Sequence, residues 1–463
     1  MSEPLWTARE IAAATGGRVE GDDFAVTGVS FDSREIGPGD LFIALAGVRD
    51  GHEFAAQALK QGAAGVLASK PVGGPSVQVA DTFKALEAMG IAARERAPQA
   101  LRGAVTGSVG KTSVTQAVAA GLARAGRSHN SVKSFNNHIG VPLTLARMPR
   151  DTERAIFEIG MNHADEITPL SRMVQPHAVA ITTVGPVHIE AFADGEQGVA
   201  RAKAEIFHGL KPGGVAVLNA DNPWFDYLSG EARKAGAEVW SFGTAGTTAK
   251  LVDFHPRSHG AAVRAELDGR PLDFPIRQSG FHWGPNSLCV LLMLKALKVD
   301  EATARAALEN FEPLAGRGAE REVRIAGGAF TLVDESYNAN PISMQAAFKS
   351  LGVRHPKGRR IVALTDMLEL GPDGAQFHAG LAEPILEAGV DLVFCAGPLM
   401  KSLFDALPPT RRGGYAETAA ELAPQVASAI EPGDLIMVKG SNGSRAASIA
   451  AALAALDCAG GGA

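Results

Sequence analysis

The chain has 463 residues, too many for a single hydrophobic core, so we expect two or three domains. Apolar residues make up 46% of the chain and charged residues 20%, a composition typical of folded rather than disordered proteins. The net charge is −6, with 44 Lys and Arg against 50 Asp and Glu, and no block of like charge stands out. A nucleic-acid-binding protein usually carries a basic stripe, so we expect no nucleic-acid partner.

The cysteines and the apolar segments indicate a protein of the reducing cytoplasm. Cys289, Cys395 and Cys458 lie far apart without a Cys-x-x-Cys pair, as expected for buried reduced thiols. The first residues lack the layout of a signal peptide, and no run approaches the roughly 18 apolar residues that a membrane span needs. We therefore expect a cytoplasmic protein with no membrane partner, for which a monomer is sufficient.

The first hundred residues predict a small mixed α/β domain. Strands are expected at 26–31, 41–45 and 65–68, and a helix at 54–61. Pro38-Gly39-Asp40 is expected to form a turn. The charged segment 95–102, which contains Pro98, marks a domain boundary.

The rest of the chain alternates short apolar strands with helices, which predicts parallel sheets. Strands are expected at 103–106, 155–159, 178–183, 215–219 and 239–242, and helices at 112–125, 199–210, 287–297 and 301–310. After Pro313 and Gly316, further strands are expected at 330–333, 361–364, 392–395 and 435–438, with a last helix at 448–456. The expected fold class is α/β in three domains: a small mixed domain (1–100), a central P-loop mononucleotide-binding domain with a parallel or mixed sheet (101–314) and a Rossmann-like domain (315–463).

A phosphate-binding loop is predicted where the strand 103–106 leads into the helix 112–125. Its residues are Thr106, Gly107, Ser108, Val109, Gly110, Lys111, Thr112 and Ser113. The glycines let backbone N–H groups turn toward phosphate oxygens, and the helix dipole adds to the attraction. Lys111 would reach the β- and γ-phosphates of ATP, and the Thr112 hydroxyl would bind Mg²⁺. Val105 stands where the general pattern has its first glycine, so a glycine-rich turn without phosphate is the alternative.

Several segments resemble the Mur ligases, the ATP-dependent amide ligases of peptidoglycan synthesis. The loop matches the family pattern Thr-Gly-x-x-Gly-Lys-Thr, and further similarity lies at 30–34, 134–144, 157–162 and 337–341. The segments 134–144, 157–162 and 337–341 are most similar to the member that adds D-alanyl-D-alanine. The chain departs from the pattern at Thr365, where glycine is usual, and in 439–445, which is longer than Lys-Gly-Ser-Arg.

The resemblance implies two Mg²⁺ ions held by Thr112, Glu158, His188 and Lys203, with Lys203 carrying CO₂ as a carbamate. Lys111, Glu158, His188 and Lys203 would then be the catalytic residues. The residues alone leave other interpretations open. Glu158 could be a solvated charge at a strand end, His188 a structural imidazole and Lys203 a solvated helix lysine.

The resemblance also implies contacts with the nucleotide and the substrates. Asn286 would meet the adenine; the residues alone indicate a cap for a helix that begins at Ser287, and both roles are compatible. Arg317, at the predicted hinge, would reach the γ-phosphate, with a surface arginine as the alternative. Asp334, placed after the first strand of the third domain, would bind the ribose. The expected substrate-binding residues are Ser33 and Arg34 for the uridine diphosphate end, Asn136, Asn137 and Thr144 on the acceptor side, and Tyr337, Asn338 and Asn340 beside the nucleotide or the acceptor.

The activity implied by the resemblance is the joining of D-alanyl-D-alanine to UDP-N-acetylmuramoyl-tripeptide (UDP-MurNAc-tripeptide), with ATP consumed and an acyl phosphate as intermediate. This would be the last cytoplasmic step of precursor synthesis. A sister Mur ligase or a folylpolyglutamate synthase is the nearest alternative. A nucleotide-dependent switch or motor is disfavoured because no clear Walker-B run is present, and a noncatalytic binding protein because the four catalytic candidates are retained. Whether the tripeptide ends in lysine or diaminopimelate stays open.

Overall fold

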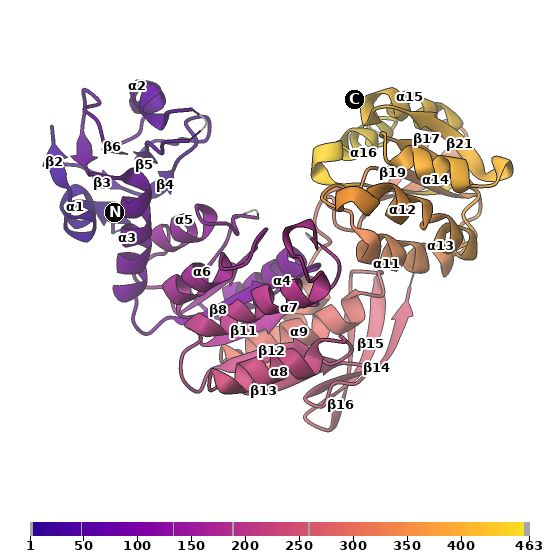
Figure 1. Cartoon of the computed structure of the whole chain (residues 1–463), viewed down its shortest axis with the longest axis horizontal. Coiled ribbons are helices and arrows are strands. Elements are labelled where there is room, and N and C mark those ends of the chain that lie inside the picture. The colour runs from indigo at the N-terminus through magenta and orange to yellow at the C-terminus, as the bar shows by residue number, and fades with distance from the viewer. Residues whose placement is uncertain (1–2, 48, 133, 188, 258–259, 458–463) are drawn as a thin grey trace.

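The computed structural model describes residues 3–47, 49–132, 134–187, 189–257 and 260–457. They form three α/β bodies, and the N-terminal and C-terminal bodies rise from the two ends of the central one (Figure 1). The three larger sheets have five, nine and six strands and are rich in parallel pairs. The predicted α/β class with three domains is therefore confirmed. No helix in the described ranges is long and apolar enough to cross a membrane.

The N-terminal body contains a five-stranded sheet in the order β2-β7-β6-β5-β4 and a two-stranded sheet of β1 and β3. The strands are β1 (Trp6–Thr7), β2 (Arg18–Glu20), β3 (Ala25–Val26), β4 (Gly28–Ser30), β5 (Asp40–Ile43), β6 (Gly65–Ala68) and β7 (Ser76–Gln78). The helices are α1 (Ala8–Thr15), the 3₁₀ turn η1 (Gly51–Phe54), α2 (Ala55–Lys60) and α3 (Thr82–Glu95). The expected strand 26–31 is divided between β3 and β4, which belong to different sheets.

The central body is built on a nine-stranded sheet in the order β16-β15-β14-β13-β12-β11-β8-β10-β9. Its strands are β8 (Leu101–Thr106), β9 (Ser128–Asn130), β10 (Arg154–Glu158), β11 (Ala178–Ile181), β12 (Val215–Asn219), β13 (Glu238–Gly243), β14 (Ala249–Pro256), β15 (Ala261–Leu267) and β16 (Arg270–Ile276). The five expected strands are present as β8, β10, β11, β12 and β13. The antiparallel meander β14–β16 was not expected.

Helices cover both faces of the central sheet. They are α4 (Lys111–Ala125), α5 (Gly140–Ala146), α6 (Ile167–Val174), α7 (Glu196–Ala204), α8 (Phe225–Lys234), α9 (Trp283–Ala296) and α10 (Glu301–Asn310), with the 3₁₀ turns η2 (Ile189–Ala191) and η3 (Glu205–Gly209). The expected helix 199–210 is α7 continued by η3. Buried side chains of α4, α9 and α10 share one apolar core, and those of α6, α7 and α8 share another.

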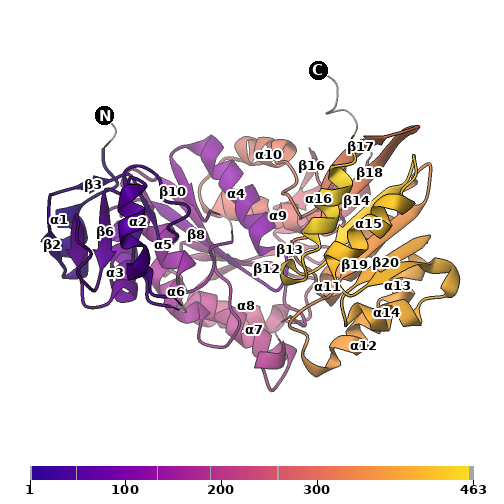
Figure 2. The ribbon, with the colours of Figure 1, turned by 90° about the horizontal axis from the view of Figure 1, so that it is seen from above.

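The C-terminal body has a six-stranded sheet in the order β17-β18-β22-β19-β20-β21, in which only the β17–β18 pair is antiparallel. Its strands are β17 (Ala319–Ile325), β18 (Gly328–Glu335), β19 (Arg360–Thr365), β20 (Leu392–Ala396), β21 (Arg412–Ala416) and β22 (Leu435–Lys439). Its helices are α11 (Pro341–Gly352), α12 (Gly374–Ala379), α13 (Ala382–Glu387), α14 (Met400–Ala406), α15 (Ala419–Ala429) and α16 (Ala447–Ala454), with 3₁₀ turns at Gly371–Asp373, Pro409–Arg411 and Asn442–Ser444. Figure 2 shows this body at the end of the molecule opposite the N-terminal body.

The short helix α5 lies in the predicted central domain but completes the core of the N-terminal body. Leu143 and Ala146 of α5 are buried together with Trp6 and Met89. The indole N–H of Trp6 donates to the carbonyl of Ala146 at 2.8 Å. The two bodies therefore share a core, and the boundary at residue 100 stays a prediction.

Candidate nucleotide and metal site

A cavity of about 520 Å³ lies where the loop before α4 faces the C-terminal body. Twelve of the residues predicted from the sequence line it: Ser108, Val109, Gly110, Lys111, Thr112, Ser113, Asn136, Glu158, Asn286, Arg317, Tyr337 and Asn338. The central body supplies one wall from the ends of β8 and β10 and the starts of α4 and α9. Residues of β18, β22 and α11 form the other wall, so both bodies contribute to one site.

The loop 107–110 has the backbone geometry of an anion-binding turn. Gly107 and Gly110 have φ values of 148° and 84°, in the region that favours glycine. A Cβ on Gly107 would collide with the Thr182 side chain, so a larger residue would displace a part of the loop or of Thr182. Gly110 caps α4 without a side chain, which leaves the N-terminal N–H groups of the helix open to an anion.

Lys111 lies against the same loop. Its Nζ donates to the carbonyl of Gly107 at 2.7 Å. Burial lowers the pKa of Lys111 below its ordinary value, while the charge of Glu158 raises it and that of Arg317 lowers it further. A phosphate group in the cavity would supply negative charge that compensates the charge of this buried ammonium.

Glu158, the last residue of β10, has one oxygen without a partner. Its side chain is 1% exposed, and Oε1 accepts a hydrogen bond from Asn136 Nδ2 at 2.7 Å. Oε2 is buried and has no hydrogen-bond partner among the described residues. Leaving a buried carboxylate oxygen unsatisfied is costly, and a hard divalent cation is a suitable partner for it. The interpretation as a solvated strand-end charge is wrong, and the site fits Mg²⁺.

Lys203 on α7 is 2% exposed, and its side chain makes no hydrogen bond or ion pair with the residues that the structure describes. Burial, followed by the charge of Lys111, holds the pKa of Lys203 well below its ordinary value. The solvated-lysine interpretation is therefore wrong. His188 lies outside the described residues. Within those residues, no group of three His, Cys, Asp or Glu side chains forms a ready metal site.

One alternative role and one predicted nucleotide contact need correction. Asn286 lies inside α9, which begins at Trp283, so it is not a helix cap; its amide lies beside Gly110 in the cavity wall. Asp334 lies within β18, the second strand of its sheet, and does not line the cavity. Its carboxylate accepts from the N–H groups of Gly316 and Ser336, both at 3.1 Å. Because neighbouring strand residues point to opposite faces, Glu335 reaches the cavity instead.

Arg317 joins the two bodies at the cavity. Its Nη2 donates to Thr112 Oγ1 at 3.1 Å, and its guanidinium lies 4.2 Å from the ring centre of Tyr337. The surface-arginine alternative is therefore wrong. The Tyr337 hydroxyl in turn donates to Ser134 Oγ at 3.1 Å, which gives a second contact between the bodies.

Several residues of the cavity were not assigned a role from the sequence: Ser134, Asn219, His282, Glu335 and Lys439. Lys439 is buried at the end of β22 and donates to the Asn338 carbonyl at 3.0 Å and to Glu335 Oε2 at 3.2 Å. A lysine that follows four apolar strand residues and precedes Gly440 was a signal that could have been used.

The remaining predicted residues do not line the cavity. Thr106 is the last residue of β8 and Gly107 begins the loop, and neither is among the residues that line the cavity. Ser33 and Arg34 lie in the N-terminal body, where Arg34 pairs with Asp32 at 2.6 Å. Asn137, Thr144 and Asn340 have local roles, since Asn137 Oδ1 accepts from Gly140 N at 2.9 Å, Thr144 Oγ1 donates to Gly140 O at 2.8 Å and Asn340 caps α11. Their contacts with substrate stay predictions.

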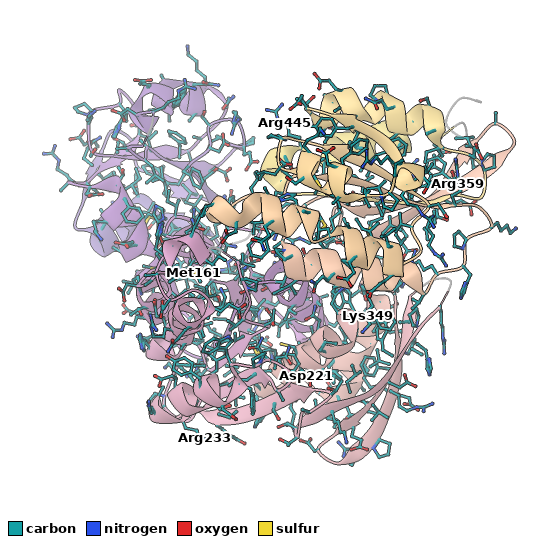
Figure 3. All side chains as sticks on the ribbon, turned by 45° about the vertical axis from the view of Figure 1, so that its right-hand side comes forward. Met161, Asp221, Arg233, Lys349, Arg359 and Arg445 are labelled. Atoms are coloured by element: carbon teal, nitrogen blue, oxygen red, sulfur yellow. The ribbon has the colours of Figure 1, made fainter. Side chains whose placement is uncertain are left out.

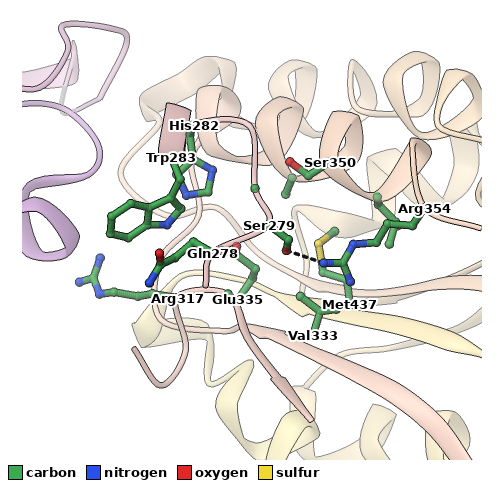
Figure 4. A pocket seen from close by; sticks show the side chains of 14 residues that line it. Gln278, Ser279, His282, Trp283, Arg317, Val333, Glu335, Ser350, Arg354 and Met437 are labelled. Atoms are coloured by element: carbon green, nitrogen blue, oxygen red, sulfur yellow. Dashed lines mark hydrogen bonds between the residues drawn. The ribbon is translucent and has the colours of Figure 1, made fainter. Parts of the chain in front are cut away.

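A smaller cavity of about 30 Å³ adjoins the first and marks the junction between the bodies (Figure 4). Ser279 of the central body accepts from Arg354 of the C-terminal body, and the Phe281 N–H donates to Ser350 Oγ at 3.1 Å. Lys349 lies where α11 faces the central body (Figure 3), with its ammonium 5.6 Å from the ring centre of Phe281. The C-terminal body is therefore held against the central body at this junction as well as at the P-loop.

Fold and site together define a three-domain P-loop protein whose nucleotide cavity is completed by its C-terminal domain. Residues 25–100 match the Mur ligase family catalytic domain, 105–294 the Mur ligase middle domain and 321–442 the Mur ligase, glutamate ligase domain. The chain belongs to the Mur ligase family.

Relatives match over nearly the whole chain. The chain is 31% identical to the UDP-N-acetylmuramoyl-tripeptide--D-alanyl-D-alanine ligase of Rickettsia prowazekii, with 95% of this chain and 97% of that one covered. Identity to the ligase of the same name from Escherichia coli K12 is 33%, over 84% and 86% of the two chains. A crystal structure of MurF from Acinetobacter baumannii superposes with a TM-score of 0.86 at 27% identity, covering 98% and 99%.

Proposed function

We propose that the protein is an ATP-dependent ligase that joins D-alanyl-D-alanine to UDP-N-acetylmuramoyl-tripeptide. The names of the curated relatives that match along the chain support this substrate pair. The observation that carries the reaction class is the shared cavity, in which a P-loop and a buried acid of one domain face an arginine of another. This arrangement suits phosphoryl transfer, in which positioning and charge neutralisation supply most of the catalysis.

The triphosphate of ATP is held by the loop 107–110 and the first turn of α4. Lys111 and Arg317 supply positive charge on the two sides of the cavity, where negative charge develops as the γ-phosphoryl group moves. Asn286 meets the adenine, and Glu335 rather than Asp334 is placed to accept hydrogen bonds from the ribose hydroxyls. Lys439 holds the Glu335 carboxylate in place.

Thr112, Glu158, His188 and a carbamylated Lys203 are the residues that would hold two Mg²⁺ ions. The unpaired Glu158 oxygen and the buried Lys203 amine support this assignment. A neutral lysine amine adds CO₂ to give an anionic carbamate, which offers oxygen ligands that the amine lacks. When bound, the ions would neutralise phosphate charge and polarise the group being transferred.

The reaction proceeds in two steps. A carboxylate oxygen of the tripeptide attacks the γ-phosphorus of ATP, the bond to ADP breaks, and an acyl phosphate forms. The neutral amine of the dipeptide then attacks the acyl carbon, inorganic phosphate leaves, and the proton lost from the amine passes to solvent. Because water would hydrolyse the acyl phosphate, the C-terminal domain must cover the cavity during both steps.

The N-terminal domain binds the uridine diphosphate end through Ser33 and Arg34, which keeps the reacting carboxylate directed toward the cavity. Asn136 is placed on the acceptor side, next to Glu158. One chain carries all of the parts named above, so the protein works as a monomer. Its ATP and precursor substrates place it in the cytoplasm.

Phosphate release by the purified protein tests this proposal. The assay supplies ATP, Mg²⁺ and UDP-N-acetylmuramoyl-tripeptide, with and without D-alanyl-D-alanine, and mass spectrometry checks for the pentapeptide. Rapid phosphate release that requires both substrates is expected, and the Lys111→Met variant should abolish it. A panel of single amino acids and pteroyl substrates covers the sister ligases. Release driven by one of these acceptors and not by the dipeptide would refute the assignment.

A further inference from the structure

Four side chains form a closed ring of contacts across the boundary between the central and C-terminal domains. Arg317 Nη2 donates to Thr112 Oγ1 at 3.1 Å, and Thr112 Oγ1 lies 3.3 Å from Ser134 Oγ. Ser134 Oγ accepts from the Tyr337 hydroxyl at 3.1 Å, and the Tyr337 ring lies under the Arg317 guanidinium at 4.2 Å. All four residues line the large cavity.

The ring joins segments that are distant in the sequence. The Arg317–Thr112 and Tyr337–Ser134 pairs are separated by 205 and 203 residues. Within the C-terminal side, the Tyr337 N–H donates to the Gly316 carbonyl at 3.0 Å, so the backbone also ties Tyr337 to the residue before Arg317. The two side chains therefore move as one unit with the C-terminal domain.

Tyr337 gives Arg317 a defined position. A guanidinium on a flexible side chain loses rotamer freedom when it is fixed, and an aromatic face below it restricts where it can lie. The Tyr337 side chain is 37% exposed, so packing alone does not hold its ring in place. The hydrogen bond to Ser134 anchors the ring at its far end.

The Thr112 hydroxyl has two lone pairs, and one of them accepts the Arg317 N–H. Arg317 Nη2 lies 3.1 Å from this oxygen, so a divalent cation bound to the oxygen would repel the guanidinium, and we expect Arg317 to move away from Thr112 when metal and nucleotide enter. The stack on Tyr337 and the Tyr337–Ser134 bond do not compete with the cation. They can keep Arg317 beside the P-loop while its hydrogen bond passes to the nucleotide.

We propose that Ser134 and Tyr337 are positioning residues that hold Arg317 at the transferred phosphoryl group. This inference rests on the proposed function, because it assumes that ATP binds at the P-loop. Ser134 and Tyr337 act through Arg317 and take no proton and form no bond in the reaction.

Three variants test the hydrogen bond itself. Tyr337→Phe keeps the ring under Arg317 and removes the hydroxyl, Ser134→Ala removes the acceptor, and the double variant removes both. Each should lower kcat for phosphate release by about three- to tenfold, the worth of one neutral hydrogen bond, with KM for the muramoyl substrate unchanged. The double variant should be no slower than the slower single variant, because both changes break the same contact.

The Arg317→Met background separates positioning from general stability. If Tyr337 acts through Arg317, adding Tyr337→Phe to Arg317→Met should change kcat by less than about twofold. Tyr415→Phe is the matched control, since this tyrosine lies in the same domain and its hydroxyl donates to Gly397 O at 3.3 Å, away from the cavity. This control should keep full activity. Melting temperatures of all variants report on folding.

Additive losses from Tyr337→Phe and Arg317→Met would overturn the proposal, and so would an unimpaired Ser134→Ala. The affinity for a non-hydrolysable ATP analogue, measured by calorimetry, gives a readout that does not need turnover. Tyr337→Phe should weaken this affinity in the Arg317 protein and leave it unchanged in Arg317→Met. If the unmodified protein bound the analogue but made no pentapeptide, the proposed substrates would be wrong. The affinities of Tyr337→Phe, Arg317→Met and the combined variant would still decide whether Tyr337 positions Arg317.

Discussion

Asn136 donates a hydrogen bond to one oxygen of the Glu158 carboxylate, at 2.7 Å, and the second oxygen stays buried without a partner among the described residues. The amide therefore fixes the orientation of the carboxylate and leaves one oxygen for another ligand. Most buried polar groups in folded proteins are hydrogen-bonded, so an oxygen left without a partner inside the cavity is suited to bind a ligand. Glu158 is accordingly the residue at which stability and activity should oppose each other.

Replacing Glu158 by Gln should separate the two properties. The amide keeps an acceptor for Asn136 but removes the charge that a divalent cation needs, so phosphate release should fall by about 100-fold or more. In metal-free buffer, the melting temperature should be unchanged or higher, because burying a neutral amide costs less than burying a carboxylate with one unpartnered oxygen. Thermal melts and a phosphate assay measure the two effects. The exposed Glu238→Gln is the control, and an active Glu158→Gln protein would contradict the metal assignment.

The carbamate on Lys203 predicts chemical rescue. Lys203→Ala should abolish turnover, and millimolar formate or acetate should restore part of it by placing a carboxylate in the space left by the side chain. Lys203→Arg places a guanidinium that stays protonated at this position and cannot carry CO₂ in this way, so it should be inactive and poorly rescued. Steady-state phosphate release with and without added acid is the measurement. The exposed Lys84→Ala controls for nonspecific effects of the acid. Full activity of Lys203→Ala in CO₂-free buffer would exclude the carbamate.

Two histidines of the central domain predict a loss of stability in mild acid. Burial lowers the pKa of His129 and of His177 to about 4, from an ordinary value of 6.5. Between about pH 4 and pH 6.5, these histidines are therefore protonated in the unfolded chain but not in the folded protein. Their contribution to stability is complete above pH 6.5 and is lost as the pH falls toward 4, with a slope of up to about 1.4 kcal/mol per pH unit for each proton.

Urea unfolding at several pH values between 7.5 and 4.5 measures this slope. In the parent protein, the backbone N–H of Arg102 donates to His177 Nδ1 at 3.1 Å. His177→Asn keeps an acceptor for this N–H and removes the titrating group. The free energy of unfolding of this variant should fall less steeply with acid than that of the parent protein. The exposed His255→Asn controls for the loss of an imidazole. Parallel curves for His177→Asn and the parent would refute the assignment.

The position of α5 predicts which fragments fold. A fragment that ends at residue 100 lacks Leu143 and Ala146, so its core would be open to water, and we expect no cooperative unfolding. A fragment of residues 1–150 should show more helical structure and a thermal transition by circular dichroism. In the whole chain, Leu143→Ala should lower the free energy of unfolding by about 2–5 kcal/mol. A sharp transition in the shorter fragment would show that its core is complete without α5.

The elements that the sequence predicted best are the buried strands and the loop after β8. Their signals are local, because an apolar run followed by glycines and a lysine defines strand, turn and helix together. The meander β14–β16 was missed because its strands alternate buried and exposed residues, so no continuous apolar run marks them. The start of α9 was missed because His282, at its N-cap, makes no capping hydrogen bond, so the sequence carries no start signal there.

Site residues were predicted where a motif names them and missed where only the tertiary structure decides. Asp334 and Glu335 are adjacent acids in β18, and the choice between them depends on which face of the strand meets the cavity. Lys439 reaches Glu335 from a strand about a hundred residues later. Ser134 had no signal beyond its place in a similar segment, because its partner Tyr337 lies in another domain.

The division of the cavity wall between two domains has a consequence for inhibition. A compound that contacts both Ser134 and Tyr337 can bind fully only when the two domains lie together, and it would then hold them in that arrangement. Its dissociation would require the domains to separate first, so residence times should be long even for a compound of modest size. Screens that measure off-rates would find such compounds more readily than screens for competition with ATP.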